Sequence, residues 1–490
     1  MKRINFGTDG WRALMSTADY LNDNALINVE SVEIVAQAFA DYLRSSGKTV
    51  NGAAVGFDGR RNSELFAGVF ASVLSGNSIN VFLSDRICPT PLLSFYTKHF
   101  GLDAGVMITA SHNPPEYNGI KFKAAYGGPF LTEDTLMVEK LLAKSKVVRN
   151  NSLVSKVDFF SPYIEHLRKE IDIEMISKSK LSVLVDSMGG AGENLIESFF
   201  SNSTLPHDPD FRIKTIFAPA NELFYGRFAE PIEKNLTPLK SALMEGKYSM
   251  GLATDGDADR LGVMLENGEW LSAQETILLL SDFAVNKKNL LGAVVKTSSV
   301  TDKISQLFYE RGRKVLDVQV GFKYICEEMI SGDVAFGGEE SGGFGFANHL
   351  PERDGIFSAL IFIEMVAGSG YSSLSDYVNI KRKEFGKIFY SRIDHHYYEK
   401  DISLKLPKLL ESPPTEIAGF PVKSVQKFYG SHRNVNGIKF YLEGKPRWLL
   451  IRVSETEPMF RFYAEGENDS EVFDLLETGK NLIQGKKIAL

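Results

Sequence analysis

The chain has 490 residues, of which 43% are hydrophobic and 24% are charged, a composition typical of a globular protein of about three or four domains. Its formal net charge is −7, so the surface as a whole repels nucleic acid and acidic membranes. Two cysteines, Cys88 and Cys326, cannot form a disulfide framework. Residues 1–8 have no apolar core typical of a signal peptide, and no uncharged apolar stretch reaches the ~18 residues that span a bilayer. We expect a cytoplasmic protein without nucleic-acid or membrane partners.

The first third of the chain alternates between strand-like and helix-like patterns. Residues 32–43 carry apolar side chains at helical spacing, Ser63 is placed to cap a second helix, and Pro91 can open a third. This alternation predicts a βαβ layout with a largely parallel sheet. A polar stretch at 144–156 indicates a domain boundary near residue 150. The predicted strands cover residues 53–57, 79–83 and 104–108.

Residues 109–121 follow the third of these strands. The tandem prolines Pro114 and Pro115 forbid a helix and stiffen the loop. Asn118-Gly119 predicts a tight turn into a further strand, which returns Lys121 to the neighbourhood of Ser111. A small hydroxyl on a rigid loop beside an amine suits a nucleophile or phosphate carrier served by a proton shuttle.

A second series of strands and helices contains an acidic loop. Asp255, Asp257 and Asp259 stand at i, i+2 and i+4 between two apolar stretches. Three carboxylates so close repel one another unless a cation neutralises them, and hard cations prefer oxygen ligands. An EF-hand calcium loop is the alternative, with Glu266 at its twelfth position, but Arg260 replaces the glycine required at the sixth. We therefore predict a magnesium site open to a phosphate oxygen.

Two further loops mark the second half of the chain. Residues 337–343 leave a predicted strand of a third α/β series, and their two carboxylates and one hydroxyl suit the hydroxyls of a sugar. After residues 368–370 the pattern changes to that of a small α+β domain. Between two of its predicted strands, residues 452–458 are followed by Arg461. Two arginines and two hydroxyls on this tight loop predict a phosphate-binding site.

Together, these segments resemble the α-D-phosphohexomutase superfamily, which includes phosphoglucomutases, phosphomannomutases and phosphoglucosamine mutases. The matching segments occur in the family's order from near the start of the chain to near its end. They are residues 7–10, 109–121, 255–260, 338–342 and 452–458. The resemblance implies three related α/β domains with mixed sheets, followed by a smaller α+β C-terminal domain, around a central active-site cleft.

This resemblance places the domains at residues 1–150, 151–267, 268–370 and 371–490. They carry, in order, the phosphoserine loop, the metal-binding loop, the sugar-binding loop and the phosphate-binding loop. A cleft that closes on its substrate requires a hinge, which we predict near residues 368–370.

The resemblance also assigns roles to individual positions. Ser111 matches the serine that carries the phosphoryl group, and with Asp255, Asp257 and Asp259 it completes a site for one Mg²⁺ per chain. Lys121 matches the general acid/base, for which we expect burial or phosphate release to lower its pKa. The other positions matched to the catalytic centre are His112, Arg12 and Arg260. The substrate-binding positions are Glu339, Ser341, Lys323, Arg353, Arg452, Ser454, Thr456 and Arg461.

The implied activity is the interconversion of glucose 1-phosphate and glucose 6-phosphate by a monomer or weak homodimer. Phospho-Ser111 gives its phosphoryl group to the 6-hydroxyl, and the resulting hexose 1,6-bisphosphate, which also serves as activator, returns its 1-phosphate. The sequence Glu339-Glu340-Ser341 favours glucose over glucosamine. The alternatives are a phosphomannomutase, a dual-specificity enzyme, a phosphoglucosamine mutase, a metal-dependent phosphatase and a non-catalytic sugar-phosphate binding protein.

Two positions depart from the family's pattern. Glu455 places a negative charge in the phosphate-binding loop, where relatives have glycine or a small polar residue. Gly343 stands where many relatives have histidine, so a histidine acid/base role does not transfer to this chain.

Overall fold

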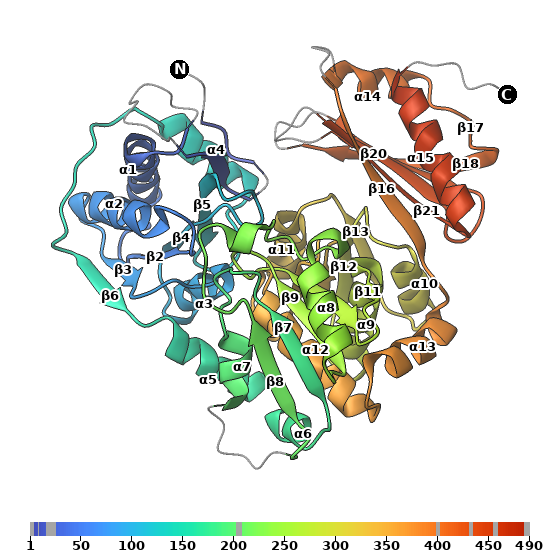
Figure 1. The fold of residues 1–490 in the computed structure, drawn as a ribbon. Helices are drawn as coiled ribbons and strands as arrows, with labels where there is room; N and C mark the ends of the chain where they lie inside the picture. Colours follow the sequence, from blue (N-terminus) through green and yellow to red (C-terminus); the bar gives the residue numbers. More distant parts are fainter. Residues whose placement is uncertain are drawn as a thin grey trace.

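The computed structural model describes residues 4–7, 9–15, 26–201, 208–397, 402–430, 435–453 and 459–484, the side chains of 402–404 excepted. Within these residues the chain forms four sheets that follow one another along the sequence (Figure 1). The first three combine with helices as α/β units with mixed sheets, and the last sheet is antiparallel. The predicted fold class is confirmed.

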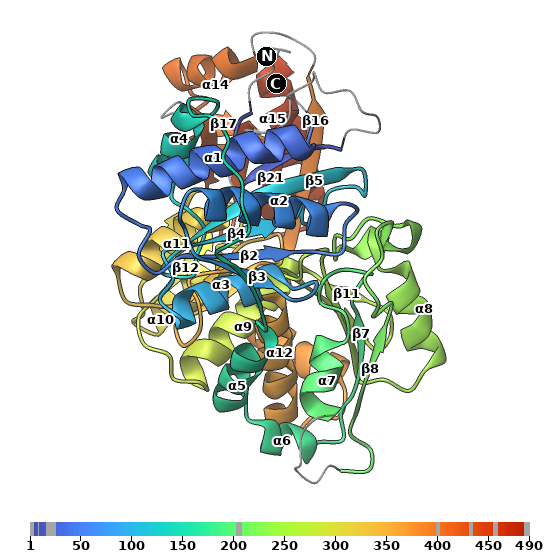
Figure 2. The ribbon, with the colours of Figure 1, turned by 90° about the vertical axis from the view of Figure 1, so that its left-hand side faces the viewer.

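The first sheet is mixed, with the strand order β1-β5-β4-β2-β3-β6. Strands β2, β3, β4 and β6 run parallel, whereas β5 pairs antiparallel with β1 and β4. Figure 2 shows α1 and α2 covering one face, where their apolar side chains share a core with the strands. The strands are β1 (Trp11–Leu14), β2 (Ala53–Phe57), β3 (Val81–Ser84), β4 (Ala104–Ile108), β5 (Tyr117–Ala124) and β6 (Val154–Val157), and the helices are α1 (Val29–Ser45), α2 (Ser63–Gly76), α3 (Thr90–His99) and α4 (Thr132–Leu141).

The predicted turn at Asn118-Gly119 is wrong, because both residues lie inside β5. Gly119 pairs with Arg12 of the antiparallel strand β1. A Cβ at Gly119 would lie 2.5 Å from the carbonyl oxygen of Trp11, so the glycine permits a close approach of strands rather than a turn.

The helix cap predicted at Ser63 is also wrong. Ser63 is the first residue of α2, and its hydroxyl donates to Oδ1 of Asp58 at 2.7 Å, while Asn62 takes the cap position. The expected start of α3 at Pro91 is confirmed within one residue. At the other end of this part, β6 pairs with β3 and carries the first sheet beyond residue 150.

The second and third sheets are mixed as well. Their strand orders are β11-β10-β9-β7-β8 and β13-β12-β14-β15, and the hairpin strand β15 was not predicted. The second group comprises β7 (Ser182–Asp186), β8 (Arg212–Ile216), β9 (Met250–Thr254), β10 (Leu261–Leu265) and β11 (Trp270–Leu271), with α5 (Phe160–Glu170), α6 (Ile173–Ser177), α7 (Leu195–Ser201), α8 (Thr237–Glu245) and the 3₁₀ turns η1 (Phe224–Gly226) and η2 (Glu233–Asn235). The third comprises β12 (Ala293–Thr297), β13 (Val315–Val318), β14 (Val334–Gly338) and β15 (Phe344–Phe346), with α9 (Ala273–Asn286), α10 (Lys303–Glu310), α11 (Phe322–Ser331) and α12 (Gly355–Ser369).

Helix α12 joins these two groups. It is buried from Gly355 to Val366 and contacts elements of both, including α7, α9, β10 and β15. Its apolar side chains therefore belong to a core that the two groups share. Among the described helices, none alone is long and apolar enough to cross a membrane. One pair, α12 with α13 (Leu374–Phe385), meets that test only across an 84° bend.

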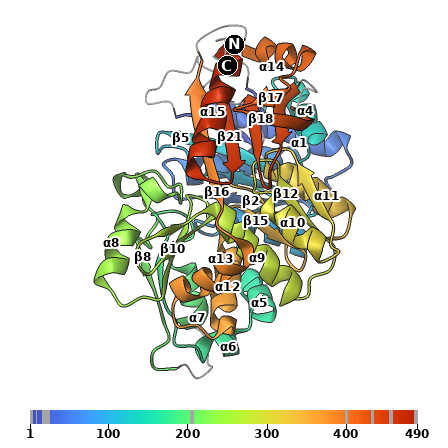
Figure 3. The ribbon, with the colours of Figure 1, turned by 90° about the vertical axis from the view of Figure 1, so that its right-hand side faces the viewer.

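The C-terminal sheet has the order β16-β21-β20-β19-β18-β17. Helix α15 packs on one of its faces, as Figure 3 shows. The sequence predicts strands near residues 437–442, 448–453 and 460–464 and a helix at 470–484, and these agree with β19, β20, β21 and α15. Strands β16 to β18 were not predicted. The elements are α13 (Leu374–Phe385), β16 (Phe389–His396), α14 (Ile402–Glu411), β17 (Glu416–Ile417), β18 (Phe420–Tyr429), β19 (Val435–Leu442), β20 (Trp448–Val453), β21 (Met459–Gly466) and α15 (Asp469–Gln484).

The opposite face of this sheet meets the third sheet through four charged side chains, Lys296, Asp302, Asp317 and Lys439, which we name the docking cluster. The Lys296 ammonium lies 3.0 Å from Asp302 and 2.8 Å from Asp317. The Lys439 ammonium lies 3.2 Å and 3.4 Å from the same two carboxylates. Both lysines are fully buried. Two positive and two negative charges thus neutralise one another where the C-terminal sheet docks.

Candidate active site

Ser111 lies on the loop that leaves the end of β4. Its φ of +54° is left-handed, a conformation that costs on the order of 1 kcal/mol or more and persists where the surroundings impose it. The buried hydroxyl donates to Oδ2 of Asp255 at 2.9 Å and lies 3.2 Å from Nδ1 of His112. A Cβ at Gly256 would lie 2.3 Å from the Ser111 carbonyl oxygen. The serine loop and the acidic loop therefore meet backbone to backbone.

Lys121 returns on β5 to the same place, as the sequence predicts. Its Nζ lies 2.8 Å from Asp257, 3.0 Å from Asp259 and 2.9 Å from Asp9. Burial lowers the pKa of Lys121, but the three carboxylates outweigh burial and raise that pKa above its ordinary value. The expectation of a lowered pKa is therefore wrong for this arrangement, because the surrounding negative charge keeps the ammonium protonated.

Asp255, Asp257 and Asp259, the acidic triplet, occupy the turn between β9 and β10. One carboxylate oxygen from each lies within 4.8 Å of the others, and all three residues are buried. Burial and then the two neighbouring carboxylates raise the pKa of Asp255 well above its ordinary value. Among the described residues, Oδ1 of Asp257 and Oδ1 of Asp259 are buried without a hydrogen-bond partner. Carboxylate oxygens that lie this close together and have no hydrogen-bond partner are suitable ligands for Mg²⁺.

Two arginines and a histidine flank the serine. Arg12 donates to Oδ1 of Asn113 at 2.9 Å, while Arg260 lies 3.9 Å from Asp255 and 3.8 Å from Asp259. Burial, followed by the charges of Arg260 and Arg12, lowers the pKa of His112 well below its ordinary value. His112 is therefore a neutral imidazole beside two fixed cations.

Arg353 joins this centre to the sugar loop. Its guanidinium contacts Asp9, lies 2.7 Å from Asp259 and donates to Oε1 of Glu339 at 2.9 Å. Ser341 donates to the same Glu339 oxygen at 2.6 Å. The structure thus brings Glu339, Ser341 and Arg353 together with the acidic triplet. We name Asp9, Lys121, Asp257, Asp259 and Arg353 the central cluster.

The absence of a side chain at position 343 has a local steric reason. A Cβ at this position would lie 2.2 Å from Cδ of Arg353 and 3.0 Å from Oε1 of Glu339. The side chain of Arg353 occupies the space that any larger residue at 343 would need.

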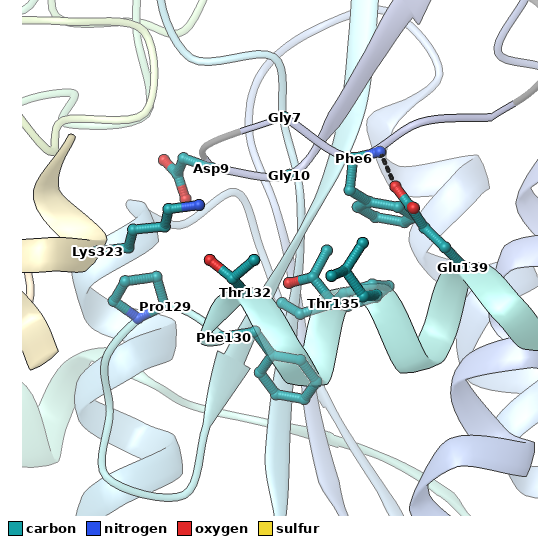
Figure 4. A pocket seen from close by; sticks show the side chains of 12 residues that line it. Phe6, Gly7, Asp9, Gly10, Pro129, Phe130, Thr132, Thr135, Glu139 and Lys323 are labelled. Carbon is teal, nitrogen blue, oxygen red and sulfur yellow. Dashed lines mark hydrogen bonds between the residues drawn. The ribbon is translucent and has the colours of Figure 1, made fainter. Parts of the chain in front are cut away.

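Lys323 approaches from α11. Figure 4 shows its amine directed toward Asp9, at the edge of a cavity lined mainly by α4 and the segment before β1. The cavity has a volume of about 30 Å³. Such a volume holds little more than a water molecule. Lys323 therefore lies beside Asp9.

Arg452 and Arg461 are register partners on β20 and β21. Arg452 is buried, and Nε of Arg461 lies 3.9 Å from Oδ2 of Asp394. The structure places both arginines on the C-terminal sheet rather than within the central cluster. Ser454, Glu455 and Thr456 lie outside the described residues, so their predicted roles remain predictions.

Sequence reasoning missed several residues of the site. Asp9 was part of a matched segment without a role of its own, although its carboxylate contacts Lys121 and Arg353. Thr90, the first residue of α3, donates to Oδ2 of Asp257 at a distance of 2.5 Å. Thr90 carries no local signal, because only the approach of two separate sheets brings it to the acidic triplet.

Comparison with known proteins agrees with this geometry. Three consecutive parts of the chain match the α/β/α domains I, II and III of phosphoglucomutase/phosphomannomutase, over residues 3–149, 161–268 and 272–385. A phosphoglucomutase/phosphomannomutase from Thermococcus kodakarensis is 29% identical, with 98% of each chain covered. A phosphoglucomutase from Komagataeibacter xylinus is 27% identical over 97% of this chain and 90% of its own.

A solved structure also resembles the whole chain. A protein from Thermus thermophilus, provisionally named a phosphomannomutase, is 31% identical and superposes with a TM-score of 0.80, with 98% of this chain and 99% of the other covered. Two other relatives, 26% and 28% identical, are named phosphoglucosamine/phosphogalactosamine mutase and phosphoglucosamine mutase. The chain therefore belongs to the phosphoglucomutase/phosphomannomutase family of the α-D-phosphohexomutase superfamily, and it is a phosphohexomutase, an isomerase of a magnesium-dependent family.

Proposed function

We propose that the protein interconverts glucose 1-phosphate and glucose 6-phosphate, with mannose phosphates as further substrates, through a phosphoryl group carried on Ser111 Oγ. The carrying observation is one buried centre in which the Ser111 hydroxyl, the Lys121 ammonium and the acidic triplet are in contact. A phosphate carrier requires this combination of a hydroxyl, a proton shuttle and a metal site. A sugar-phosphate binding protein has no need of all three.

Phosphoryl transfer depends mainly on positioning and on stabilising the charge of the moving group. Magnesium held by the acidic triplet would supply part of the positive charge that stabilises this group. Arg12 and Arg260 add two cations beside Ser111. Neutral His112 adds a hydrogen bond at Ser111 Oγ without altering the charge.

Lys121 holds a proton at Nζ, which makes it the acid that protonates the oxygen leaving phosphorus. The amine formed in that step then takes the proton of the attacking hydroxyl. In one direction the leaving oxygen is Ser111 Oγ and the attacking oxygen belongs to the hexose. In the other direction the two exchange roles, so a single lysine serves both.

We assign the sugar loop to the hydroxyls of the hexose, and its sequence Glu339-Glu340-Ser341 favours glucose over glucosamine. Glu339 accepts from Ser341 and Arg353, which orients its carboxylate toward the centre. Carboxylate oxygens accept hydrogen bonds from sugar hydroxyls. We assign Arg452 and Arg461 to the substrate's non-reacting phosphate, because guanidinium groups bind phosphate in a fixed geometry. The names of the relatives make glucose, mannose and glucosamine phosphates the candidates to compare.

The test of the phosphate carrier is Ser111→Ala, assayed with glucose 1-phosphate, Mg²⁺ and a trace of glucose 1,6-bisphosphate. We expect loss of covalent phosphate and a fall in turnover of ~10³-fold or more, as for removal of a nucleophile. Ser281→Ala is the matched control, since Ser281 is a buried serine of α9 whose hydroxyl donates to a backbone carbonyl. Wild-type turnover by Ser111→Ala would overturn the proposal, and release of free phosphate by the native protein would indicate a phosphatase.

The test of the sugar is a side-by-side assay with the 1-phosphates of glucose, mannose and glucosamine. We expect the highest kcat/KM with glucose 1-phosphate and a lower value with mannose 1-phosphate. Preference for glucosamine 1-phosphate would contradict the assignment of the sugar while leaving mutase chemistry intact.

A further inference from the structure

We propose that Arg60 is a positioning residue for phosphoryl transfer, whose guanidinium holds the serine loop, residues 111–117, against the acidic loop. This inference rests on the proposed role of Ser111. Arg60 lies in the turn between β2 and α2, and its side chain is fully buried. It contacts the backbone of the serine loop rather than the reacting atoms.

Four carbonyl groups of the serine loop accept hydrogen bonds from this one guanidinium. Nη2 donates to the oxygens of Ser111 at 2.6 Å and Asn113 at 2.7 Å. Nη1 donates to the oxygens of Pro114 at 2.8 Å and Tyr117 at 2.9 Å. The tandem prolines have no N–H to donate, so this irregular loop cannot order itself as a helix or strand would. The loop is instead wound around the arginine.

The other side of the guanidinium meets the second group of elements. Cζ of Arg60 lies 4.8 Å from the ring centroid of Phe224, and Nε lies 3.3 Å from Oδ2 of Asp58. Cε1 of Phe224 lies 3.5 Å from the place of a Cβ at Gly256, in the acidic loop. Arg60 therefore fills the seam at which the serine loop and the acidic loop touch.

This placement has a geometric and an electrostatic consequence. Four carbonyl oxygens point toward Arg60, and the guanidinium neutralises their partial negative charges. These charges therefore do not repel the phosphoryl group that Ser111 would carry. The same contacts fix the backbone from which the Ser111 hydroxyl reaches Asp255 at 2.9 Å. Without the guanidinium, the loop can shift relative to the acidic triplet while the sugar loop stays in place.

The test compares Arg60→Met and Arg60→Lys with Arg313→Met, in the full chain. Arg313 is a matched control because it also donates to two backbone carbonyls, of Leu290 and Gly292, in a turn of the third group. We expect Arg60→Met to lower kcat by ~100-fold, the loss that a misplaced reacting group produces, while KM for glucose 1-phosphate changes little. Arg60→Lys should recover part of kcat, because an ammonium can donate to some of the four carbonyls.

Single-turnover transfer from glucose 1,6-bisphosphate to Ser111 should slow in the same order. A kcat for Arg60→Met equal to that of Arg313→Met, or a rise in KM that accounts for the whole loss, would overturn the inference. If Arg60→Met does not fold, Arg60→Lys gives the decision by the same split between kcat and KM. Failure of the proposed function is distinguishable, because then Ser111→Ala would keep its turnover whatever the Arg60 variants do.

Discussion

Two clusters of charged side chains, each with a fully buried lysine, lie in different parts of the molecule. In the docking cluster, two lysines and two aspartates pair so that each carboxylate lies within 3.4 Å of both ammonium groups. In the central cluster, two cations face three carboxylates: the ammonium of Lys121 contacts all three, and Arg353 contacts two of them. Two buried oxygens there, in Asp257 and Asp259, have no hydrogen-bond partner among the described residues.

The two clusters differ in the balance between their positive and negative charges. A buried pair that is fully matched contributes little net stability, yet breaking it is costly because one charge is left unpaired. The docking cluster is matched in this way and suits a permanent contact between sheets. The central cluster concentrates negative charge around oxygens that are still free to bind, which suits a site where a cation and a phosphoryl group are exchanged.

The largest effect is expected from Lys121→Met, which removes the shared ammonium. We expect turnover to fall by ~10³-fold, because the proton shuttle is lost. The free energy of unfolding should fall by about 3 kcal/mol without metal, since the buried Asp257 carboxylate loses its ammonium partner. Mg²⁺ should then raise the melting temperature of the variant more than that of the wild type. Turnover close to wild type would show that Lys121 only balances charge.

The next largest effect is expected from Asp257→Asn. This change should weaken Mg²⁺ binding by ~10-fold or more, measured by titration calorimetry, and should lower turnover with it. Chelation of the metal should likewise abolish turnover in the wild type and leave its circular dichroism unchanged. Asp302→Asn in the docking cluster is the matched control and should leave Mg²⁺ affinity intact. Equal losses in both variants would remove the distinction between the clusters.

Lys439→Met tests the docking cluster itself. We expect the free energy of unfolding to fall by about 3 kcal/mol, because Asp302 and Asp317 then share one ammonium. KM for glucose 1-phosphate should rise, since the same sheet carries Arg452, whereas kcat should change by less than ~10-fold. Lys427→Met, an exposed position on β18, is the control for loss of a lysine. A stability equal to that of the control would contradict the docking role.

The smallest effect concerns acid. Burial raises the pKa of Asp302, but Lys439 and Lys296 outweigh it and bring that pKa to about 2. Its stabilising contribution is therefore present above the unfolded pKa of about 3.9 and is lost as the pH falls toward the folded value. Burial and Asp302 raise the pKa of Glu465, so its contribution varies only at higher pH. Between about pH 4 and about pH 2.5, wild type should lose about 1 kcal/mol more stability than Asp302→Asn, measured by denaturant titration. Equal losses would contradict the linkage.

The sequence predicts individual strands and loops of this molecule well, but it predicts contacts between separate sheets poorly. Apolar runs such as 104–108 and 250–254 are strands because their periodicity is local, and the loops after them hold Ser111 and the acidic triplet. Thr90 could not be assigned, because its contact with Asp257 depends on how two sheets approach. The docking cluster is unpredictable for the same reason, since residues 296 and 439 meet only after both sheets have formed.

Other misses came from patterns with two physical meanings. Asn118-Gly119 is typical of a turn, but a glycine also permits close strand approach, and pairing with β1 decided the outcome. Strand β16 was not predicted because its charged and aromatic residues are half-buried or exposed rather than alternating cleanly. The pKa of Lys121 was expected to fall with burial, whereas the number of carboxylates around it determines its direction.

The close packing of Gly343 against Arg353 also constrains how such a site can change. A Cβ at 343 meets Cδ of Arg353 at 2.2 Å, so the two positions compete for one volume. A chain that acquires a side chain at 343 must shorten or redirect residue 353, and with it the link between Asp259 and Glu339. We expect the residues at positions 343 and 353 to covary in an alignment. Gly343→His alone should disrupt the site, whereas the same exchange combined with a shorter residue at 353 should be tolerated.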